Sequence, residues 1–358
     1  MLNKIPTTVI TGFLGAGKTT LIRHLINNAG GRKIALIINE FGDLGVDGEI
    51  LKGCNDEACK EEDIVELSNG CICCTVADDF IPTMQKLLER NTQLDHILIE
   101  TSGLALPQPL LRAFKWPEIQ TKVTVDGVIT VVDGKAVTEG RFAHSIEAVD
   151  RQRKLDENLD HETPLSELFE DQIACADMIV INKSDLLTAS QGDDLLSQLK
   201  QDSRDGVQVL KSEMGVLPVD ILLGQKAMAE DDLEDRHELH HHHHDHDDDH
   251  DDDHDDDHDD DHDHDAFESF IISTGEIDNP EEFSKLILDV IRDHDILRLK
   301  GFVAVNGKPL RLTIQAVGPR IETYFDRVFK SSEKRETKLV VIGEKGMDQV
   351  SIQKALQV

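Results

Sequence analysis

The sequence lacks any run of about 18 apolar residues, the length that a helix needs to cross a membrane, so no membrane span is expected. No leader is expected either, because KIPTTVITGFLGAGKTT, from Lys4 onward, has the pattern of a strand running directly into a loop. Basic residues are scarce: 37 Lys and Arg stand against 71 Asp and Glu, for a net charge of −34. This balance disfavours nucleic acid and anionic membranes as partners, and it favours cations and basic protein surfaces in a cytoplasmic protein.

More than half of the net negative charge lies in one segment. Residues 231–265 hold 20 acidic residues and one basic residue, and they include HELHHHHHDHDDDHDDDHDDDHDHD. A segment of such low complexity cannot bury a core, so we predict a disordered linker there. Its imidazoles favour weak, multivalent capture or buffering of metal ions, and a solvated acidic spacer is the alternative. The segment is called the His/Asp run below.

Apolar runs alternate with helical patterns before this run. The alternation predicts an α/β P-loop NTPase domain over residues 1–230, with a mostly parallel sheet covered on both faces. The chemistry is then expected at the carboxyl ends of the strands. The expected strands are 5–11, 32–39, 95–103, 125–134 and 176–185, and the expected helices are 18–30, 79–90 and 165–176.

A small α+β domain is predicted over residues 266–358. FESFIISTG has a strand pattern, and NPEEFSKLILDVIRDH has a helical one. ILRLKGFVAV and PLRLTIQAVG flank Asn306-Gly307, which is a strong hairpin signal. A short helix over 321–329 and a strand over TKLVVIGE complete the expected domain.

The segment from Gly12 to Thr19 fits the phosphate-loop pattern G-x-x-x-x-G-K-[ST], with a strand pattern before it and a helical pattern after it. Its main-chain N–H groups and the helix N-terminus can hold phosphates. Lys18 can reach the β- and γ-phosphates, and the Thr19 hydroxyl can bind Mg²⁺. The alternative is a glycine-rich turn without a ligand. The expected nucleotide-binding residues of this loop are Gly12, Gly15, Ala16, Gly17, Lys18, Thr19 and Thr20.

Guanine is the base expected at this site. Asn182, Lys183 and Asp185 form an N-K-x-D motif after an apolar strand pattern. A carboxylate there can accept two hydrogen bonds from the guanine edge, and adenine offers no such pair of donors. The alternative is an ATP site beside a coincidental turn.

Two acidic residues at strand ends are expected on the Mg²⁺ and water side of the site. Glu100 ends the strand pattern HILIE, and Glu40 follows IALIIN, where a switch loop would begin. With Lys18, they make the expected catalytic set. The alternative for each glutamate is a capping or turn residue.

Three of the six cysteines, Cys71, Cys73 and Cys74, lie within four positions. Thiolates suit Zn²⁺, Co²⁺ or Cu⁺, and this spacing is unlike a structural zinc ribbon. We therefore predict a transition-metal site, with buried packing cysteines as the alternative. Cys54 and Cys59 remain open as auxiliary ligands, a redox pair or surface thiols. Cys175 is expected in the core, and His24, His96 and His144 are expected to be structural.

Several segments together resemble one known family. TVITGFLGAGKTT, NEFGDLGVDGEIL, ELSNGCICCTVADDF, IETSGLALPQPL and INKSDLL are similar to segments of the CobW-like metal-chaperone GTPases of the P-loop class. The ending ILRLKGFVAV…LTIQAVGPRIETYFDR is similar to the family's C-terminal domain, so the resemblance covers nearly the whole chain. The family includes members associated with cobalt supply for cobalamin and also zinc chaperones.

This resemblance implies a GTP-hydrolysing metallochaperone. By matching motifs, Lys18 and Thr19 carry over as phosphate and Mg²⁺ residues, and the C-x-C-C cysteines as the metal motif. Mg²⁺·GTP would order the switch around Glu40 and tighten the metal site, and slow hydrolysis would release the metal to a client. Co²⁺ is the first expected cargo, with a cobaltochelatase as client, and Zn²⁺ is the second. A GTP-dependent homodimer is a further expectation.

Two other classes of function remain open at this point. In a metal-storage protein, the His/Asp run would do the main task and GTP would be incidental. In a signalling GTPase, the thiols would bind a structural zinc, and metal affinity would not depend on the nucleotide.

Overall fold

The computed structural model describes residues 4–38, 64–66, 80–89, 94–143, 145–155, 164–233, 236, 266–330 and 333–357. The chain divides into two compact units, Met1–Leu239 and His240–Val358. Within the described ranges, no helix combines the length and the apolar character that a membrane crossing needs. The predicted disordered linker, the His/Asp run, lies outside the described residues apart from its first few positions.

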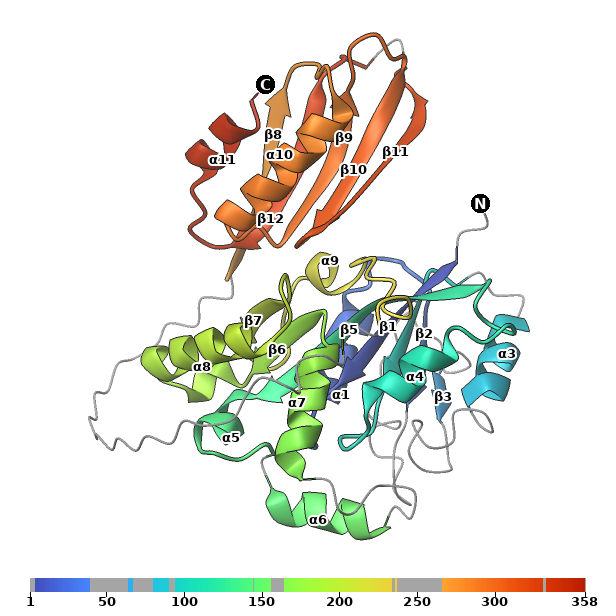
Figure 1. The fold of residues 1–358 in the computed structure, drawn as a ribbon, viewed down its shortest axis with the longest axis vertical. Coiled ribbons are helices and arrows are strands. Elements are labelled where there is room, and N and C mark those ends of the chain that lie inside the picture. Colours follow the sequence, from blue (N-terminus) through green and yellow to red (C-terminus); the bar gives the residue numbers. More distant parts are fainter. Residues whose placement is uncertain are drawn as a thin grey trace. The chain divides into compact units, whose positions relative to one another are not determined.

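The first unit is built on a parallel sheet of seven strands in the order β3-β2-β4-β1-β5-β6-β7 (Figure 1). Every neighbouring pair in this sheet is parallel. The central strands are buried along most of their length and carry mostly apolar residues, as is usual for strands covered on both faces. The strands are β1 Ile5–Thr11, β2 Ile34–Ile38, β3 Ile64–Glu66, β4 His96–Glu100, β5 Val123–Asp133, β6 Met178–Asn182 and β7 Gln208–Ser212.

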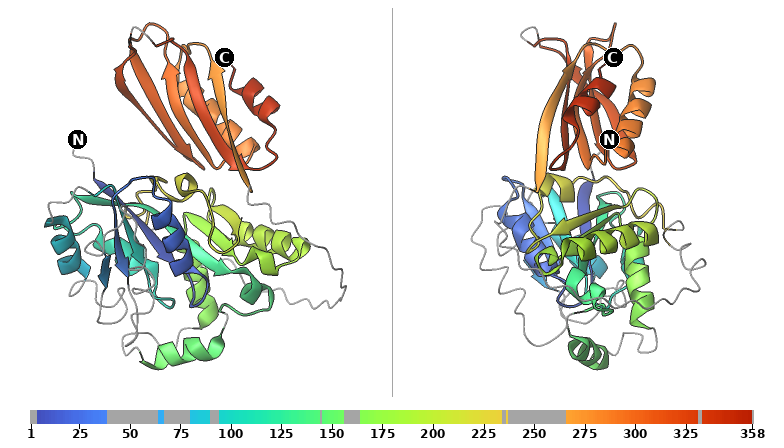
Figure 2. Two further views of the ribbon diagram at one scale, coloured as in Figure 1. Left: turned by 180° about the vertical axis from the view of Figure 1, so that it is seen from behind. Right: turned by 90° about the vertical axis from the view of Figure 1, so that its left-hand side faces the viewer.

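Helices cover both faces of this sheet. Figures 1 and 2 show α1 on one face, with α4 and α7 on the other. Phe80, Met84 and Phe114 pack against the sheet in one core cluster, and Ile173 and Leu195 pack in another beside β6. The predicted P-loop α/β fold is confirmed. The helices are α1 Lys18–Asn27, α3 Ile81–Glu89, α4 Pro107–Ala113, α5 Gly134–Thr138, α6 Ile146–Leu155, α7 Leu165–Cys175, α8 Ala189–Asp202 and α9 Val219–Leu222, with a 3-10 turn η3 at Ser184–Leu186.

The second unit is an antiparallel sheet in the order β11-β10-β9-β12-β8, with α10 and α11 on one face (Figure 2). Ile287 from α10 packs with Leu299, Ile314 and Leu339 in its core. The hairpin predicted around Asn306-Gly307 is confirmed, with Gly307 at φ 71°. The elements are β8 Phe267–Thr274, α10 Pro280–Asp293, β9 Arg298–Ala304, β10 Leu310–Val317, β11 Arg320–Val328, β12 Thr337–Glu344 and α11 Gln349–Ala355.

The short helix predicted over 321–329 is wrong. The segment is β11, paired antiparallel with β10 in a register that includes Ile314 opposite Thr323 and Ala316 opposite Ile321. Its β-branched and aromatic side chains favour a strand, and pairing with β10 supplies backbone partners that a short helix would have to find internally. Local spacing of apolar residues could not report that pairing.

Candidate nucleotide and metal site

The phosphate loop connects the end of β1 to the start of α1. Gly12 has φ 133°, and a Cβ there would lie 2.1 Å from the main-chain oxygen of Val131 in β5. Gly15 and Gly17 also have positive φ, at 78° and 103°. These glycines adopt backbone conformations that would be strained in a residue with a side chain. Ala16, between Gly15 and Gly17, is fully buried. The main chain can therefore turn closely around a phosphate, as the sequence pattern predicts.

Lys18 begins α1, and its side chain turns back across the loop. Its Nζ donates hydrogen bonds to the main-chain oxygens of Gly12 at 2.8 Å and Phe13 at 3.3 Å. The residue is buried, with 7% of its surface exposed. The ammonium group is thus held over the concave side of the loop, within reach of an anion bound there. Thr20 follows in the first turn of the same helix.

Thr19, in the first turn of α1, and Glu100, at the end of β4, come together. The Thr19 hydroxyl donates a 3.1 Å hydrogen bond to Glu100 Oε1. Glu100 is the last residue of β4, which pairs with β1 so that Ile10 lies opposite Glu100, and it is buried. A hydroxyl and a carboxylate oxygen at this distance are hard ligands of the kind Mg²⁺ takes beside phosphates, so the residues present fit that ion.

The segment after Glu100 lies against the phosphate loop. Thr101 N donates to Ile10 O at 3.0 Å, which continues the β1–β4 pairing by one residue. A Cβ on Gly103 would lie 2.7 Å from the main-chain nitrogen of Leu14. The two loops therefore touch backbone to backbone, and only glycine permits that approach. Residues 101–106 are called the β4–α4 loop below.

Asn182 ends β6 and connects three segments. Its Nδ2 donates to Ala16 O at 2.8 Å, and its Oδ1 accepts from Gly215 N at 2.9 Å. It is buried, and a Cβ on Gly17 would lie 2.1 Å from its Nδ2. Both polar atoms of this side chain therefore bind protein backbone, which fixes the N-K-x-D segment against the phosphate loop.

Lys183 and Asp185 follow Asn182 with different environments. Lys183 has φ 60°, and its Nζ forms a 2.5 Å ion pair with Asp133 Oδ2 at the end of β5. Asp133 is buried and also caps α5 by accepting from Ala136 N. The side chain of Asp185, in η3, is exposed. Lys183 thus orients the segment, and the Asp185 carboxylate faces solvent, where a base could meet it.

The loop after β7, residues 213–216, is part of this site although no motif marks it. Gly215 packs so closely on α1 that a Cβ would lie 2.9 Å from Leu21 N. Met214, before it, has φ 50° and an exposed side chain. The one sequence signal is the run VQVLKSEMG, a strand-like stretch that ends at a glycine. A strand predicted from this run would have placed the loop at the carboxyl edge of the sheet.

The expected metal ligands and the switch residue lie outside the described residues. This applies to Glu40, Cys71, Cys73, Cys74 and the histidines of the His/Asp run. Cys54 and Cys59, whose role the sequence leaves open, and His144, which was expected to be structural, also lie outside the described residues. The described ranges contain no group of three or more His, Cys, Asp or Glu residues that could hold a metal ion.

Three isolated residues that were expected to be structural have structural contacts. His96 is buried and shares a 2.8 Å hydrogen bond with Thr8 Oγ1. His24 Nε2 lies 2.8 Å from the main-chain oxygen of Leu217. Burial raises the pKa of the Cys175 thiol to about 12, so this core thiol stays protonated.

Comparisons with known proteins agree with this arrangement. The family model described as CobW/HypB/UreG, nucleotide-binding domain, matches residues 6–211, and the cobalamin synthesis protein cobW C-terminal domain matches residues 267–358. A relative from Sinorhizobium sp., named zinc chaperone CobW, is 54% identical over 99% of this chain and 96% of its own length. Another of the same name, from Pseudomonas aeruginosa, is 48% identical over 99% of this chain and 92% of its own.

A solved structure of similar extent is the Zn(II)-bound YjiA GTPase from E. coli, which is 22% identical with a TM-score of 0.41 and covers 99% of this chain and 98% of its own. Because both family models match and a relative that is 54% identical spans almost the whole chain, the resemblance seen in the motifs is confirmed. The chain belongs to the CobW/HypB/UreG family, with a CobW C-terminal domain after its nucleotide-binding domain.

Proposed function

We propose that the protein is a GTP-hydrolysing zinc metallochaperone. The observation that carries this proposal is the pair of relatives named zinc chaperone CobW, each matched over 99% of this chain. The phosphate-loop geometry and the exposed Asp185 beside it support the nucleotide part. The cargo part rests on the C-x-C-C cysteines of the sequence.

Zinc replaces cobalt as the first cargo. The expectation of Co²⁺, a cobaltochelatase client and a role in cobalamin synthesis came from resemblance, and the names of the two relatives favour zinc instead. Thiolates are good ligands for Zn²⁺, and ligand preference alone does not favour Co²⁺ over it. Co²⁺ therefore enters only as the competing ion in the test below.

The described residues have separate tasks in this proposal. The phosphate-loop N–H groups and Lys18 bind and neutralise the β- and γ-phosphates. Asp185 accepts hydrogen bonds from guanine, while Asn182 and Lys183 hold its loop in place through Ala16 and Asp133. Glu100 orients the Thr19 hydroxyl. Mg²⁺, held by Thr19 with Glu100 nearby, would neutralise charge on the phosphates.

Nucleotide state gates the cargo in this proposal. GTP orders the segment around Glu40, which in sequence leads into Cys71, Cys73 and Cys74. These thiolates then bind Zn²⁺ tightly, and hydrolysis loosens the site so that the ion passes to a client protein. The His/Asp run loads or buffers metal, and a homodimer forms in the GTP state.

Competition titration of Zn²⁺ and Co²⁺ tests the proposal. The full chain, Cys73→Ser, Lys18→Ala and a variant lacking residues 237–265 are each measured with Mg²⁺·GTP analogue and with Mg²⁺·GDP. We expect Zn²⁺ to bind the triphosphate form at least about 100-fold more tightly, a coupling of about 2.7 kcal/mol. Cys73→Ser and Lys18→Ala should both remove this difference, and the deletion should keep it. Equal affinities in both nucleotide states would indicate a structural or storage site and overturn the proposal.

A further inference from the structure

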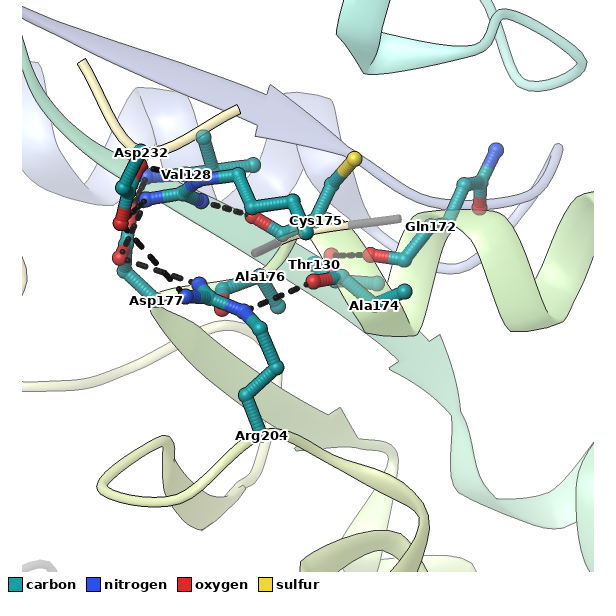
Figure 3. Close-up of polar contacts among 10 residues, drawn as sticks. Val128, Thr130, Gln172, Ala174, Cys175, Ala176, Asp177, Arg204 and Asp232 are labelled. Atoms are coloured by element: carbon teal, nitrogen blue, oxygen red, sulfur yellow. Dashed lines mark hydrogen bonds and ion pairs between the residues drawn. The ribbon is translucent and has the colours of Figure 1, made fainter. Parts of the chain in front are cut away.

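Gln172 on α7 connects that helix to the β4–α4 loop. It is fully buried, and its Nε2 donates to Gly103 O at 3.2 Å and Ala105 O at 3.4 Å. Its own main-chain oxygen accepts a 2.8 Å hydrogen bond from Thr130 Oγ1 on β5 (Figure 3). The main chain of Gln172 is thus bound to the sheet, and its side-chain amide binds two carbonyl groups just beyond Glu100.

The end of α7 is fixed by two arginines, one turn beyond Gln172. Arg204 donates to Ala174 O at 2.9 Å and to Ala176 O at 2.8 Å (Figure 3). Arg236 donates to Cys175 O. These guanidinium groups satisfy carbonyls at a helix C-terminus, where positive charge is favourable. Helix α7 therefore cannot shift along its axis without breaking several charge-assisted hydrogen bonds.

Both arginines are in turn held by Asp177. Its Oδ1 lies 2.9 Å from Arg236 Nη2 and 3.5 Å from Arg204 Nη2, and its Oδ2 accepts from Val128 N at 2.9 Å. Asp232 adds a second carboxylate on the same guanidinium groups. The helix end is consequently anchored to β5 and to the residue that precedes β6, so that Gln172 acts from a rigid support.

The β4–α4 loop lies between two contacts. On one side, Gly103 touches the phosphate loop at Leu14. On the other, Gly103 O and Ala105 O accept from Gln172. The loop directly follows Glu100, whose carboxylate accepts from the Thr19 hydroxyl, and it leads into α4 at Pro107. A displacement of this loop would therefore move Glu100 relative to Thr19 and the phosphates.

The chemistry of Gln172 fits a positioning task better than core packing. Its two acceptors are carbonyl oxygens, so only a side chain that carries hydrogen-bond donors can bind them, and the amide of Gln172 supplies two N–H donors. Its Oε1 is buried without a hydrogen bond in the described part of the chain, and an unmade bond of this kind is unfavourable. An apolar residue of the same size would avoid that cost but would leave Gly103 and Ala105 without their side-chain donor.

We propose that Gln172 is a positioning residue for GTP hydrolysis, which holds the β4–α4 loop so that Glu100 stays aligned with Thr19. This inference rests on the proposed GTPase function. Because the contacts concern alignment of reacting groups rather than the phosphate grip of Lys18, their loss should act on kcat more than on KM.

The test compares two variants that each lose a buried glutamine amide. Gln172→Met keeps the length of the side chain and removes its donors. Gln225→Met is the matched control, because Gln225 is equally buried but donates to Leu222 O, away from the phosphate loop. In full-length protein, Gln172→Met should lower kcat for GTP about tenfold, with KM changed by less than about twofold. Gln225→Met should leave kcat unchanged.

Hydrogen exchange of residues 101–106 gives a second readout. Gln172→Met should exchange faster in this segment while β1 and β6 keep their wild-type rates. Unchanged kcat and unchanged exchange would overturn the proposal, and so would an equal loss of kcat in Gln225→Met. If Gln172→Met does not fold, Gln172→Asn takes its place, because it keeps a donor but is one methylene shorter. Wild-type kcat and exchange in that variant would also overturn it.

The controls separate this proposal from the proposed function. If the wild type does not hydrolyse GTP faster than Lys18→Ala, the GTPase assignment fails. The exchange comparison, made on protein with GDP, still decides whether Gln172 holds the loop. If the wild type hydrolyses GTP and Gln172→Met has the same kcat and the same exchange rates as the wild type, the positioning role alone fails.

Discussion

The side chain of Asn182 donates a 2.8 Å hydrogen bond to the main-chain oxygen of Ala16, so the end of β6 holds the phosphate loop from behind. The opposite atom of the same amide accepts from Gly215 N. One buried side chain thereby sets the spacing between the phosphate loop, the N-K-x-D segment and the loop after β7. The base and phosphate sides of the site cannot shift independently while this amide is in place.

Replacing Asn182 with Ala should therefore weaken binding of every nucleotide. Two buried backbone groups would lose their partners, at a cost of about 1–3 kcal/mol each. We expect at least about a tenfold loss of affinity for both GDP and ADP analogues, together with a lower unfolding midpoint. Fluorescence titration and urea denaturation measure the two effects. Wild-type stability in Asn182→Ala would contradict the role of this amide.

Asp185→Asn should instead change only the choice of base. The carboxylate is exposed and makes no contact on which the loop depends in the described structure, so stability should stay within about 0.5 kcal/mol of the wild type. An amide can donate to the 2-oxo group of xanthine, where guanine carries an amino group. We expect weaker GDP binding and stronger XDP binding in parallel titrations. A uniform loss for both bases would show that Asp185 does not read the base.

The Thr19–Glu100 pair should govern the metal dependence of the nucleotide site. Thr19→Val keeps the shape of the side chain and removes its hydroxyl, and Glu100→Gln keeps the shape but removes the charge. We expect both variants to bind GDP without Mg²⁺ as the wild type does, and to lose most of the affinity that Mg²⁺ adds. Hydrolysis in each should fall by about 100-fold. Titrations with and without EDTA separate the affinity for GDP alone from the affinity that Mg²⁺ adds. An unchanged Mg²⁺ effect would exclude this pair as the ion's ligands.

His96 should make stability depend on pH. Burial lowers the pKa of His96 from its ordinary value of 6.5, with Arg32 acting in the same direction and Asp126 opposing. As the pH falls, His96 therefore binds a proton near pH 6.5 in the unfolded chain but remains neutral there in the folded chain. Its contribution to stability is complete above that pH and is lost as the pH falls towards the folded pKa, by up to about 1.4 kcal/mol per pH unit.

Comparison with His96→Gln isolates this effect. Glutamine can keep a hydrogen bond to Thr8 but does not titrate in this range. Urea denaturation at pH 7.5 and 5.5 should show a larger loss of unfolding free energy in the wild type than in the variant. Equal losses in the two proteins would mean that His96 does not titrate differently on folding.

Arg236 should be far more important for stability than a surface arginine. Its side chain is fully buried, and Asp177 and Asp232 outweigh the effect of burial and raise the pKa of its guanidinium group. Arg236→Met removes one of the two guanidinium groups that pair with the buried Asp177 carboxylate. This should lower the free energy of unfolding by about 3–5 kcal/mol. Arg32→Met, which breaks a half-exposed ion pair with Asp220, should cost about 0–1 kcal/mol. Similar costs for both variants would contradict this reading of the buried cluster.

The double variant Arg236→Met with Asp177→Asn gives a further check. Removing the carboxylate charge as well should recover part of the loss, because no buried charge then lacks its partner. Strict additivity of the two single changes would argue that these side chains do not act as a unit.

The parts of the fold that could be predicted from the sequence are those with a strong local signal. The phosphate loop and its flanking elements carry glycines and apolar runs at fixed spacing, and the hairpin at Asn306-Gly307 carries its turn residues. By contrast, β11 was predicted as a helix because its pairing partner β10 decides its conformation. Strand β7 was not predicted, and neither was helix α8, although Thr188 and Gln191 form a capping box at its start, which is a local helix signal.

The site shows the same division. Lys18, Thr19 and Asp185 follow from motifs because their chemistry is written in residue type and spacing. Contacts such as Gln172 with Gly103, or Arg236 with Asp177, join segments that are far apart in the sequence. No local pattern encodes such a pair, since either partner alone is an ordinary polar residue. These relationships become visible only when the chain is folded.

The strand order of the first unit also constrains its synthesis. Strand β1 leaves the ribosome first, yet its neighbours in the sheet are β4 and β5, which end only at Glu100 and Asp133. Both edges of β1 stay unpaired until His96–Glu100 has emerged, and one edge stays unpaired until Val123–Asp133 has emerged, so the nascent chain exposes a target for aggregation and for holding chaperones. A ribosome that pauses before this point would therefore leave the nascent protein at its most vulnerable.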